Sequence, residues 1–254
     1  MRFLFASIWL GFFISCSEAI KKEDLKMLYP DKEKPIKFQQ DWQFEFYYNR
    51  IEEFKINPIG FNKIVFLGNS ITEAGADWNK RFNVQNIVNR GISGDITEGV
   101  LNRIGEIIHY KPLAVFLLIG INDIFNSDLP DRDKITAEYV SNNILNISNH
   151  IIEGSPSTKI FIQTTLPINN EIYIKEKGWF PSHSIPLTTQ INDINKLLIK
   201  KCKNTPFKII DLHSVFTNER GLLNENYTTD GVHLNENGYT AWVDFIDDVI
   251  LSLK

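Results

Sequence analysis

Short apolar runs alternate with longer amphipathic segments along most of the chain. Five runs rich in β-branched or aromatic residues predict strands at residues 63–67, 86–89, 113–119, 159–165 and 208–212. Segments with helical periodicity lie at residues 97–110, 135–154, 187–202 and 238–254. Near-continuous apolar strands that alternate with helices indicate a parallel sheet covered on both faces. We therefore predict one α/β domain over residues 59–254.

The segment at residues 1–19 has the pattern of an export signal. It combines one early positive charge at Arg2, an apolar run from Phe3 to Ile14 and then small polar residues. The run is about twelve residues long, whereas a membrane-spanning helix needs roughly 20. We therefore expect an exported bacterial protein, in the periplasm or at the outer membrane or cell surface.

Cys16 is a candidate lipidation site within this segment. Phe13-Ile14-Ser15-Cys16 resembles a bacterial lipobox, in which the cysteine is lipidated and becomes the new N-terminus. A lipobox more often has leucine where this chain has Phe13, so simple cleavage after Ala19 is the alternative. A lipid anchor at Cys16 is the membrane attachment that we expect. Cells labelled with a fatty-acid analogue test it, because equal label on the wild type and on Cys16→Ala would exclude lipidation there.

Residues 20–58 predict a tether followed by a helix. The first part is polar and rich in lysine, which is typical of a tether. From Asp41 onward, apolar side chains recur at roughly helical spacing, at Trp42, Phe46, Ile51 and Phe54. We predict a helix that covers one edge of the domain, with these side chains in the core.

Composition and charge exclude several classes of function. The 254 residues are 43% hydrophobic and 23% charged, which suits a globular domain with one large core. The net charge of -4 comes from interspersed acids and bases, without the Lys/Arg runs of a nucleic-acid footprint. The two cysteines, Cys16 and Cys202, give neither a disulfide framework nor a thiolate metal site. We therefore expect no nucleic-acid partner and no structural metal.

Residues that could take part in catalysis follow the predicted strands. Ser70 follows the first strand, Gly94 the second and Asn122 the third. Asp230 and His233 lie in a polar loop after the fifth. In an open parallel sheet, ligands bind at the carboxyl ends of the strands, where the strand order reverses. We expect these five residues to meet at that edge.

Together these residues are the components of an acyl-transfer site. A serine hydroxyl is a poor nucleophile near neutral pH and needs an adjacent base, for which histidine is suited. Asp230 comes three residues before His233 and can hold its ring in one tautomer. A tetrahedral oxyanion needs preorganised donors, which the Gly94 amide, the Asn122 side chain and the Ser70 amide can supply.

Each residue also has a purely structural interpretation. Residues 70–73 read SITE, the S-x-x-E pattern of a capping box, in which Ser70 would only begin a helix. Gly94 would be only a turn residue, and Asn122 would only begin a loop or helix. Asp230 begins a common Asp-Gly turn pair, and His233 could lie on the surface or in the core. The arrival of all five residues, in order, at predicted strand ends favours catalysis.

Four short blocks carry a resemblance to a known family. They are Gly-Asn-Ser at 68–70, Gly-Ile-Ser-Gly-Asp at 91–95, Gly-Ile-Asn-Asp at 120–123 and Asp-Gly-Val-His at 230–233. They resemble the four blocks of the SGNH hydrolases, also called GDSL esterases. The longer string at residues 89–123 most resembles their platelet-activating-factor-acetylhydrolase-like and bacterial carbohydrate-acetylesterase branch. The resemblance covers roughly residues 60–250 and implies a three-layer α/β/α, flavodoxin-like fold with a five-stranded parallel sheet.

The resemblance also implies a role for each of these residues. Ser70 would be the nucleophile, His233 the base, Asp230 the orienting acid, and Gly94 and Asn122 the oxyanion hole. The family's first block usually has aspartate where this chain has Asn69. That aspartate is neither nucleophile nor base, and a carboxamide can still accept a loop-shaping hydrogen bond. We therefore expect activity to be retained.

Trp78, Trp179 and Phe180 are candidate substrate-binding residues. Trp78 follows the serine loop, and the other two lie in a long excursion at residues 167–190 after the fourth strand. Long loops at the functional edge often bind substrate. Packing against the sheet is an equal alternative.

The sequence thus predicts a serine esterase that needs no metal or organic cofactor. Its substrate would be a small-molecule or glycan ester, such as an O-acetylated sugar or sialic acid, from which a small acyl group is removed. A short-chain lipid esterase, an acyltransferase with the same site and a non-catalytic glycan-binding lipoprotein are the alternatives. Motifs for phosphate loops, dinucleotide binding, zinc proteases and the G-x-S-x-G elbow are absent from the sequence.

Overall fold

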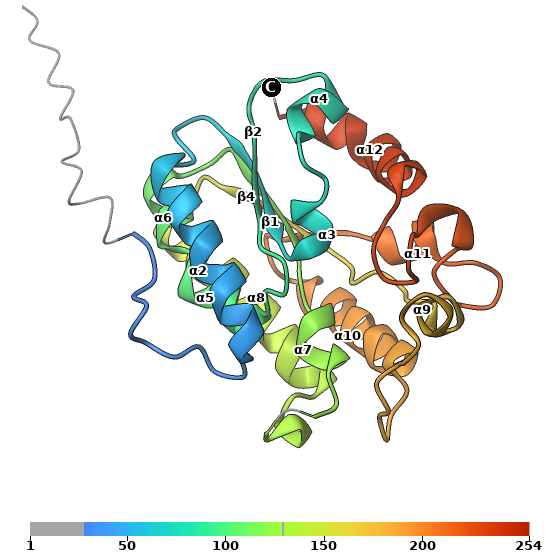
Figure 1. Ribbon diagram of the computed structural model, residues 1–254. Coiled ribbons are helices and arrows are strands. Elements are labelled where there is room, and N and C mark those ends of the chain that lie inside the picture. Colours follow the sequence, from blue (N-terminus) through green and yellow to red (C-terminus); the bar gives the residue numbers. More distant parts are fainter. Residues whose placement is uncertain (1–27, 129, 254) are drawn as a thin grey trace, which may run out of the picture.

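The structure is a computed structural model that describes residues 28–128 and 130–253. At its centre lies a five-stranded parallel sheet with the strand order β2-β1-β3-β4-β5 (Figure 1). The strands are β1 (Ile64–Gly68), β2 (Ile87–Gly91), β3 (Ala114–Leu118), β4 (Lys159–Gln163) and β5 (Lys208–Ile210). Each predicted strand is present, with bounds that differ by a few residues. The export signal and Cys16 lie outside the described residues.

Helices of very different length precede, connect and follow these strands. They are α2 (Asp41–Ile56), α3 (Ser70–Glu73), α4 (Trp78–Phe82), α5 (Thr97–Asn102), α6 (Gly105–Tyr110), α7 (Ile121–Phe125), α8 (Ala137–Gly154), α9 (Asn170–Lys177), α10 (Leu187–Cys202), α11 (Leu212–Phe216) and α12 (Glu236–Leu251), with 3-10 turns η1 (Arg132–Lys134) and η2 (Glu225–Tyr227). The single helix predicted at 97–110 is divided in two, because Arg103 ends α5 and turns its side chain inward to Asp95. The expected loop at 167–190 contains α9. Within the described ranges, no helix is long and apolar enough to cross a membrane.

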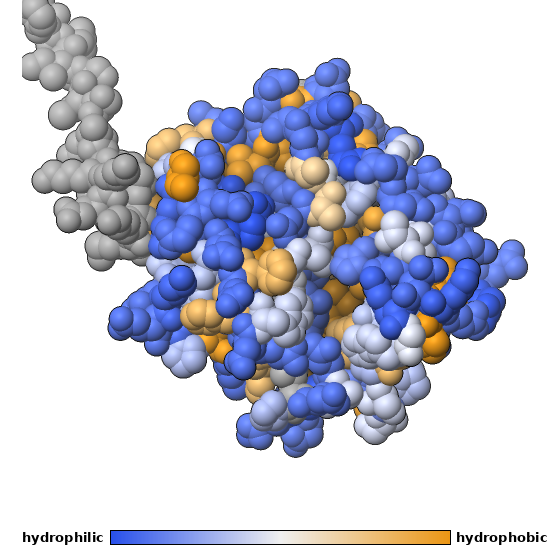
Figure 2. Space-filling view, in the orientation of Figure 1, coloured by the Kyte–Doolittle hydropathy of each residue, from blue (hydrophilic) through white to orange (hydrophobic). Residues whose placement is uncertain are grey.

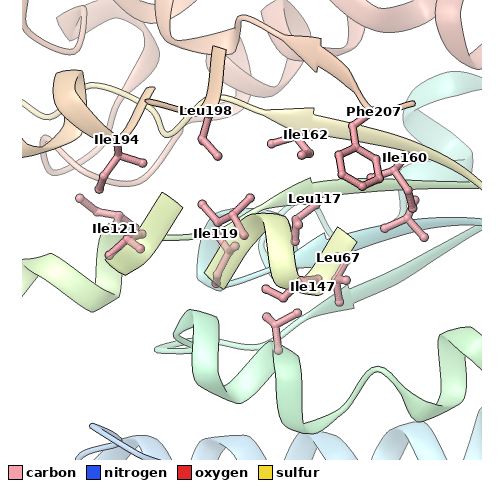
Figure 3. Close-up of a cluster of buried hydrophobic side chains, with 14 of the residues drawn as sticks. Leu67, Leu117, Ile119, Ile121, Ile147, Ile160, Ile162, Ile194, Leu198 and Phe207 are labelled. Carbon is pink, nitrogen blue, oxygen red and sulfur yellow. The ribbon is translucent and has the colours of Figure 1, made fainter. Parts of the chain in front are cut away.

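Alternate strand residues pack into two cores, one on each face of the sheet. On one face, side chains such as Leu67, Leu117 and Ile162 pack against α5, α6, α8 and α10, and Figure 3 shows part of this core. On the other face, Ile64 and Phe66 belong to the core that includes α4, α11 and α12. Fully burying a side chain of this size stabilises the fold by about 1.5–3 kcal/mol. The result is the predicted three-layer α/β/α architecture.

A column of stacked aromatic rings crosses the second core. Phe66, Phe116 and Phe161 occupy one register position of β1, β3 and β4, with successive ring centroids 5.1 and 4.6 Å apart. The indole of Trp78 stacks on Phe66 at 4.4 Å and is 1% exposed. The expectation that Trp78 binds substrate is therefore wrong, because its ring extends this buried column.

The strand order places a topological switch at β1 and β3. The chain runs from β1 to the edge strand β2 and then crosses back to form β3 on the other side of β1. The connections after β1 and β3 therefore leave the sheet in opposite directions and open a crevice at their carboxyl ends. Ser70 begins α3 directly after β1, and Asn122 lies in α7 directly after β3. The topology alone brings these two residues to one crevice.

Residues 28–40 pack on the domain, so the prediction of a tether is wrong for this part of the chain. Tyr29 and Ile36 are buried in a third apolar cluster with residues of α2. The Tyr29 hydroxyl also lies 2.9 Å from Oε1 of the buried Glu106. The segment is rich in lysine, but Tyr29 and Ile36 supply apolar contacts with the domain that a flexible tether lacks.

Helix α2 covers the domain, as predicted, and lies beside α5 and α6 (Figure 1). Two of its four predicted core side chains, Ile51 and Phe54, are buried. Its buried side chains are Gln43, Tyr47, Tyr48, Ile51 and Phe54. Trp42 and Phe46, predicted to lie in the core, are 49% and 55% exposed. Positions 43, 47, 51 and 54 form one helical stripe, and Trp42 and Phe46 each precede a member of it by one residue.

Candidate active site

Ser70, His233 and Asp230 form a continuous series of hydrogen bonds. Oγ of Ser70 lies 3.1 Å from Nε2 of His233, and Nδ1 of that ring lies 2.9 Å from Oδ2 of Asp230. Ser70 follows β1, whereas the other two residues lie between η2 and α12. A ring held in this way can accept a hydroxyl proton at Nε2 while its Nδ1–H stays fixed. The arrangement can activate a serine for attack on an ester carbonyl.

The turn at residues 230–233 sets this geometry. Oδ1 of Asp230 accepts hydrogen bonds from the backbone amides of Val232 (3.0 Å) and His233 (2.8 Å), which leaves Oδ2 for the histidine ring. Gly231 has a φ of 86°, and a Cβ there would lie 2.2 Å from the carbonyl oxygen of Asn169. The Asp-Gly pair therefore shapes the turn and orients the histidine at the same time.

Asp230 remains ionised in this setting. Burial alone would raise its pKa, but hydrogen bonds from the ring and backbone of His233, with the Val232 amide, outweigh burial and hold the pKa well below its usual range. An ionised Asp230 favours the tautomer of His233 that carries its proton on Nδ1. Nε2 is then left as the acceptor for the Ser70 hydroxyl.

Asn69, and not Ser70, caps the helix that follows β1. Its Oδ1 accepts a hydrogen bond from the Ile71 amide at 3.1 Å, and its side chain is buried. The capping-box interpretation of residues 70–73 is therefore wrong, because Asn69 satisfies the helix start and Glu73 bonds elsewhere. Oε2 of Glu73 accepts 2.6 Å hydrogen bonds from both the amide and the hydroxyl of Ser93. The Ser70 hydroxyl is consequently free to face His233.

Gly94 and Asn122 line the same cleft as Ser70. Gly94 has a φ of 79°, which glycine adopts without strain. The side-chain amide of Asn122 donates one hydrogen to the Asp95 carbonyl at 2.9 Å, which leaves its second hydrogen for a ligand. The backbone next to Gly94 therefore orients Asn122. Both groups can donate to an oxyanion formed at a carbon that Ser70 attacks.

Two buried carboxyl groups anchor this region. Oδ2 of Asp95 accepts from Nε of Arg103 at 2.9 Å, and Asp123 accepts from the amide and hydroxyl of Thr97 at 3.1 and 2.5 Å. Burial raises the pKa of Asp95 to about 6, against the opposing effect of Arg103. Burial likewise raises the pKa of Asp123 to about 7, against the hydrogen bonds from Thr97. The region below the candidate oxyanion donors thus titrates in the mildly acidic range.

Asp123→Asn is expected to weaken the pH dependence of stability. Native Asp123 binds its proton more tightly than the unfolded chain, whose pKa is near 3.8, so the free energy of unfolding falls as pH rises from about 4 to 7. Asp95 acts in the same direction up to about pH 6. Asparagine still accepts from Thr97 but does not titrate.

Urea unfolding near pH 4, 5.5 and 7 measures this effect as the slope of the unfolding free energy against pH. The depressed pKa of Asp230 affects stability mainly below this window, because its contribution is lost as pH falls through and below the ordinary value. A slope as steep in Asp123→Asn as in the wild type would show that Asp123 is not the responsible group.

A cleft of about 390 Å³ connects the candidate catalytic groups, a volume that suits a small ligand. Its other walls include Trp42, Phe125, Asn126, Tyr173 and Trp179. The surface in Figure 2 is largely hydrophilic, but hydrophobic side chains show at the bottom of a hollow near its centre. Within residues 28–128 and 130–253, no group of three or more His, Cys, Asp or Glu is placed to hold a metal ion.

The two aromatic candidates after α9 occupy different places. Trp179 lines the cleft, is 51% exposed and meets Tyr173 edge to face at 5.6 Å. Phe180 packs behind the wall, with ring centroids 6.0 Å from Phe125 and 5.7 Å from Tyr173. The expectation that Phe180 binds substrate is therefore corrected, because its ring supports two wall residues and lies outside the lining. Trp179 stays a candidate.

Several wall residues were not predicted from the sequence, among them Trp42, Phe125, Asn126 and Tyr173. Phe125 and Asn126 come three and four positions after Asn122, so the helical spacing of α7 is the signal that would have found them. Tyr173 lies on α9, which was expected to be a loop. Trp42 carried no such signal, because its helix lies far upstream of the serine.

Comparison with known proteins identifies a family over the same part of the chain. The sequence model of the GDSL-like Lipase/Acylhydrolase family matches residues 66–241. Platelet-activating factor acetylhydrolase IB subunit alpha1 from Homo sapiens is 25% identical over 197 residues, which are 75% of this chain and 76% of that protein. The matched region contains all five candidate catalytic residues.

Two further similarities have a narrower meaning. N-acylneuraminate cytidylyltransferase from Escherichia coli O18:K1:H7 is 27% identical over 214 residues, which are 80% of this chain but only 44% of that protein. The chain therefore spans less than half the length of this relative. A mutant of an acetyl-xylooligosaccharide esterase from Geobacillus superposes with a TM-score of 0.55 at 20% identity, over 74% of this chain and 95% of that one. This second likeness concerns the fold.

Proposed function

We propose that this chain, which belongs to the GDSL-like Lipase/Acylhydrolase family, is a serine esterase with Ser70 as its nucleophile. Family membership makes it an acylhydrolase; the assignment of residues is our inference. The observation that carries it is the hydrogen-bond series from Ser70 through His233 to Asp230, with distances of 3.1 and 2.9 Å. The cleft beside this series is wide enough to admit an ester.

The reaction would proceed through an acyl-enzyme. Oγ of Ser70 attacks the ester carbonyl while Nε2 of His233 takes its proton, and the new oxyanion rests on Gly94 and Asn122. His233 then protonates the leaving alcohol. Water attacks the acyl-enzyme by the same route, with His233 again as the base, and releases the carboxylic acid.

Asn122→Ala is expected to lower kcat by roughly 10²–10³ with a small change in KM, because the lost donor acts on the charged intermediate more than on the bound ester. Steady-state kinetics with p-nitrophenyl acetate measure this. A matched control is Asn79→Ala, because Asn79 also uses its carboxamide to bind backbone, the Ile87 amide and carbonyl, but lies outside the cleft lining. A rise in KM at constant kcat would assign Asn122 to substrate binding and not to the oxyanion.

The substrate that we propose is a small acyl ester, in the first place acetyl, of a carbohydrate hydroxyl. Two indole rings, Trp42 and Trp179, and the carboxamide of Asn126 face the cleft. Such a combination of aromatic surface and polar groups suits a sugar, which has apolar faces and a hydroxyl rim. The 25% identity to a platelet-activating factor acetylhydrolase subunit supports the acetyl group.

A panel of esters tests the substrate class. Acetate release is compared for acetylated xylooligosaccharides, O-acetylated sialic acid, a short-chain acetylated lipid and p-nitrophenyl acetate. We expect kcat/KM to be highest for a sugar ester. A lipid ester that exceeds every sugar would contradict the carbohydrate proposal, and absence of turnover on the whole panel would contradict the esterase itself.

Two alternatives use the same fold and are separated by simple assays. Acyl transfer to a sugar would appear as an acetylated acceptor when a competing free sugar is added, with less free acetate. A non-catalytic glycan-binding protein would fail to react with a fluorophosphonate, because only an activated serine is labelled. The intact hydrogen-bond series at Ser70 favours the enzyme over this second alternative.

A further inference from the structure

Helix α2 reaches the candidate active site although it lies upstream of the family match at residues 66–241. Its target is the segment at residues 91–95 that follows β2 and contains Gly94; we call this segment the oxyanion loop. Three side chains of α2, Trp42, Gln43 and Arg50, contact this loop or the group that holds it. A helix that only covers an edge of the domain would not need these contacts with the oxyanion loop.

Gln43 holds the peptide group that follows Gly94. Its side chain is 2% exposed, and Nε2 donates to the Gly94 carbonyl at 2.8 Å. Oε1 of Gln43 accepts from the Gln40 amide at 2.6 Å, so both ends of the carboxamide are fixed. Gly94 has the widest backbone freedom of any residue type. Because its carbonyl is held, the direction of the Gly94 amide, the candidate oxyanion donor, is restricted as well.

Arg50 braces the same loop at a second point. Its Nε lies 3.1 Å from Oε1 of Glu73, whose other oxygen accepts from the amide and hydroxyl of Ser93. Glu73 belongs to α3, the helix that begins with Ser70. The loop, the nucleophile helix and α2 are therefore joined through one carboxylate.

Trp42 covers the loop on the side of the cleft. A Cβ at Gly94 would lie 2.7 Å from two carbons of the Trp42 ring, so the indole lies directly against this glycine. Nε1 of Trp42 donates to Oε1 of Gln40 at 2.6 Å, and the same oxygen accepts from Nδ2 of Asn126 at 2.8 Å. The ring is thus held in place at the cleft, and Trp42 as a whole stays 49% exposed.

We propose that α2 contributes residues to the active site and does not only pack on the domain. Gln43 is a positioning residue that aims the Gly94 amide at the oxyanion, and Trp42 is a specificity-determining wall for the ester. The inference rests on the proposed function, since it takes Gly94 as an oxyanion donor. It predicts that a substitution of Gln43 lowers kcat, whereas a substitution of the adjacent Trp42 raises KM.

Gln43→Met tests the positioning role, because methionine has a similar length but cannot donate. We expect kcat for p-nitrophenyl acetate to fall by about 10- to 100-fold with KM changed less than about twofold, a smaller loss than removal of an oxyanion donor itself. Inhibition by methyl trifluoromethyl ketone, whose carbonyl can form a tetrahedral oxyanion adduct with Ser70, should weaken by a similar factor.

Tyr47→Phe is the matched control on the same helix. The Tyr47 hydroxyl donates to the Gly99 carbonyl at 2.8 Å, as Gln43 does to Gly94, but Gly99 lies in α5 and not in the oxyanion loop. Tyr47→Phe should lower the melting temperature and leave kcat within about twofold of the wild type. Equal kcat losses in the two variants, or unchanged kcat in Gln43→Met, would overturn the proposal.

Gln43→Glu keeps the test decisive if Gln43→Met does not fold. A protonated carboxyl can still donate to the Gly94 carbonyl, whereas the ionised form cannot. The ratio of its kcat to that of the wild type should therefore fall as pH rises through the pKa of the new carboxyl. A ratio that is independent of pH between about 5 and 9 would contradict a donor role for residue 43.

Trp42→Ala tests the wall. We expect KM for the best sugar ester to rise by about tenfold, or about 1.4 kcal/mol, with kcat within about threefold, because an aromatic contact is lost. A fall in kcat without a change in KM would contradict a wall role. Failure of this inference is separable from failure of the esterase itself, because wild-type turnover and its dependence on Ser70 are measured on the same substrates.

Discussion

Ser70→Ala is expected to lower kcat/KM for p-nitrophenyl acetate by on the order of 10⁴ or more. The reason is geometric, since Oγ of Ser70 is the hydroxyl that lies 3.1 Å from Nε2 of His233. Alanine removes the atom that would carry the acyl group, while the oxyanion donors stay in place. The variant should fold like the wild type, because the helix cap is supplied by Asn69.

A second serine in the same cleft makes this prediction sharper. Ser93 also lines the cleft, but its hydroxyl donates to the carboxylate of Glu73 and not to a histidine. Peptide mass spectrometry after fluorophosphonate treatment should find the adduct on Ser70 alone. The exposed Ser214, whose hydroxyl bonds to the Asp211 carbonyl, gives the control variant Ser214→Ala, which should keep full activity. Wild-type turnover in Ser70→Ala, or an adduct on Ser93, would refute the assignment.

The strand ends could be predicted from sequence because two independent signals agree there. Apolar runs such as residues 63–67 mark buried parallel strands, and parallel strands present their carboxyl ends at one edge. The topology then makes neighbours of Ser70 and Asn122, which are 52 positions apart in the printed sequence. Once the strands are predicted, the polar residues that follow them are the candidate site residues.

The walls of the cleft could not be predicted in the same way, because they depend on the phase of helices. A shift of one residue on α2 separates Gln43, which is buried against the loop, from Trp42, which faces the cleft. Apolar character alone favours the opposite assignment. Trp78 shows the same limit, since nothing local distinguishes an indole that stacks on Phe66 from one that lines a site.

Asn69 illustrates why a local pattern can mislead. The S-x-x-E pattern at residues 70–73 suggests that Ser70 is the cap, but a cap would engage the hydroxyl with a backbone amide. The carboxamide of Asn69 is the cap instead, because its oxygen accepts a hydrogen bond from the Ile71 amide. The serine can therefore stand at a helix start and still keep its hydroxyl free to face His233. An aspartate or an asparagine oxygen at position 69 can serve equally in this hydrogen bond.

Asp230→Asn should lower kcat by on the order of 10⁴, although asparagine is nearly isosteric with aspartate. Oδ1 of Asp230 accepts two backbone amides, from Val232 and His233. The carbonyl oxygen of an asparagine would keep that place, so its NH₂ group would face Nδ1 of His233. Nδ1 would then have to be the acceptor, and the ring proton would move to Nε2. In that tautomer Nε2 donates to Ser70 and can no longer take its proton.

Asp230→Asn should therefore be no milder than Asp230→Ala, because alanine leaves His233 free to adopt either tautomer. Lys177→Ala is the matched control, because Nζ of the exposed Lys177 side chain lies 3.5 Å from Oδ2 of the buried Asp230, and its loss should change kcat by less than about threefold. Steady-state kinetics of the three variants, with nuclear magnetic resonance of the His233 ring nitrogens, measure both the rate and the tautomer. Asp230→Asn with near wild-type kcat, or with the proton still on Nδ1, would show that the carboxylate does not act through the tautomer of His233.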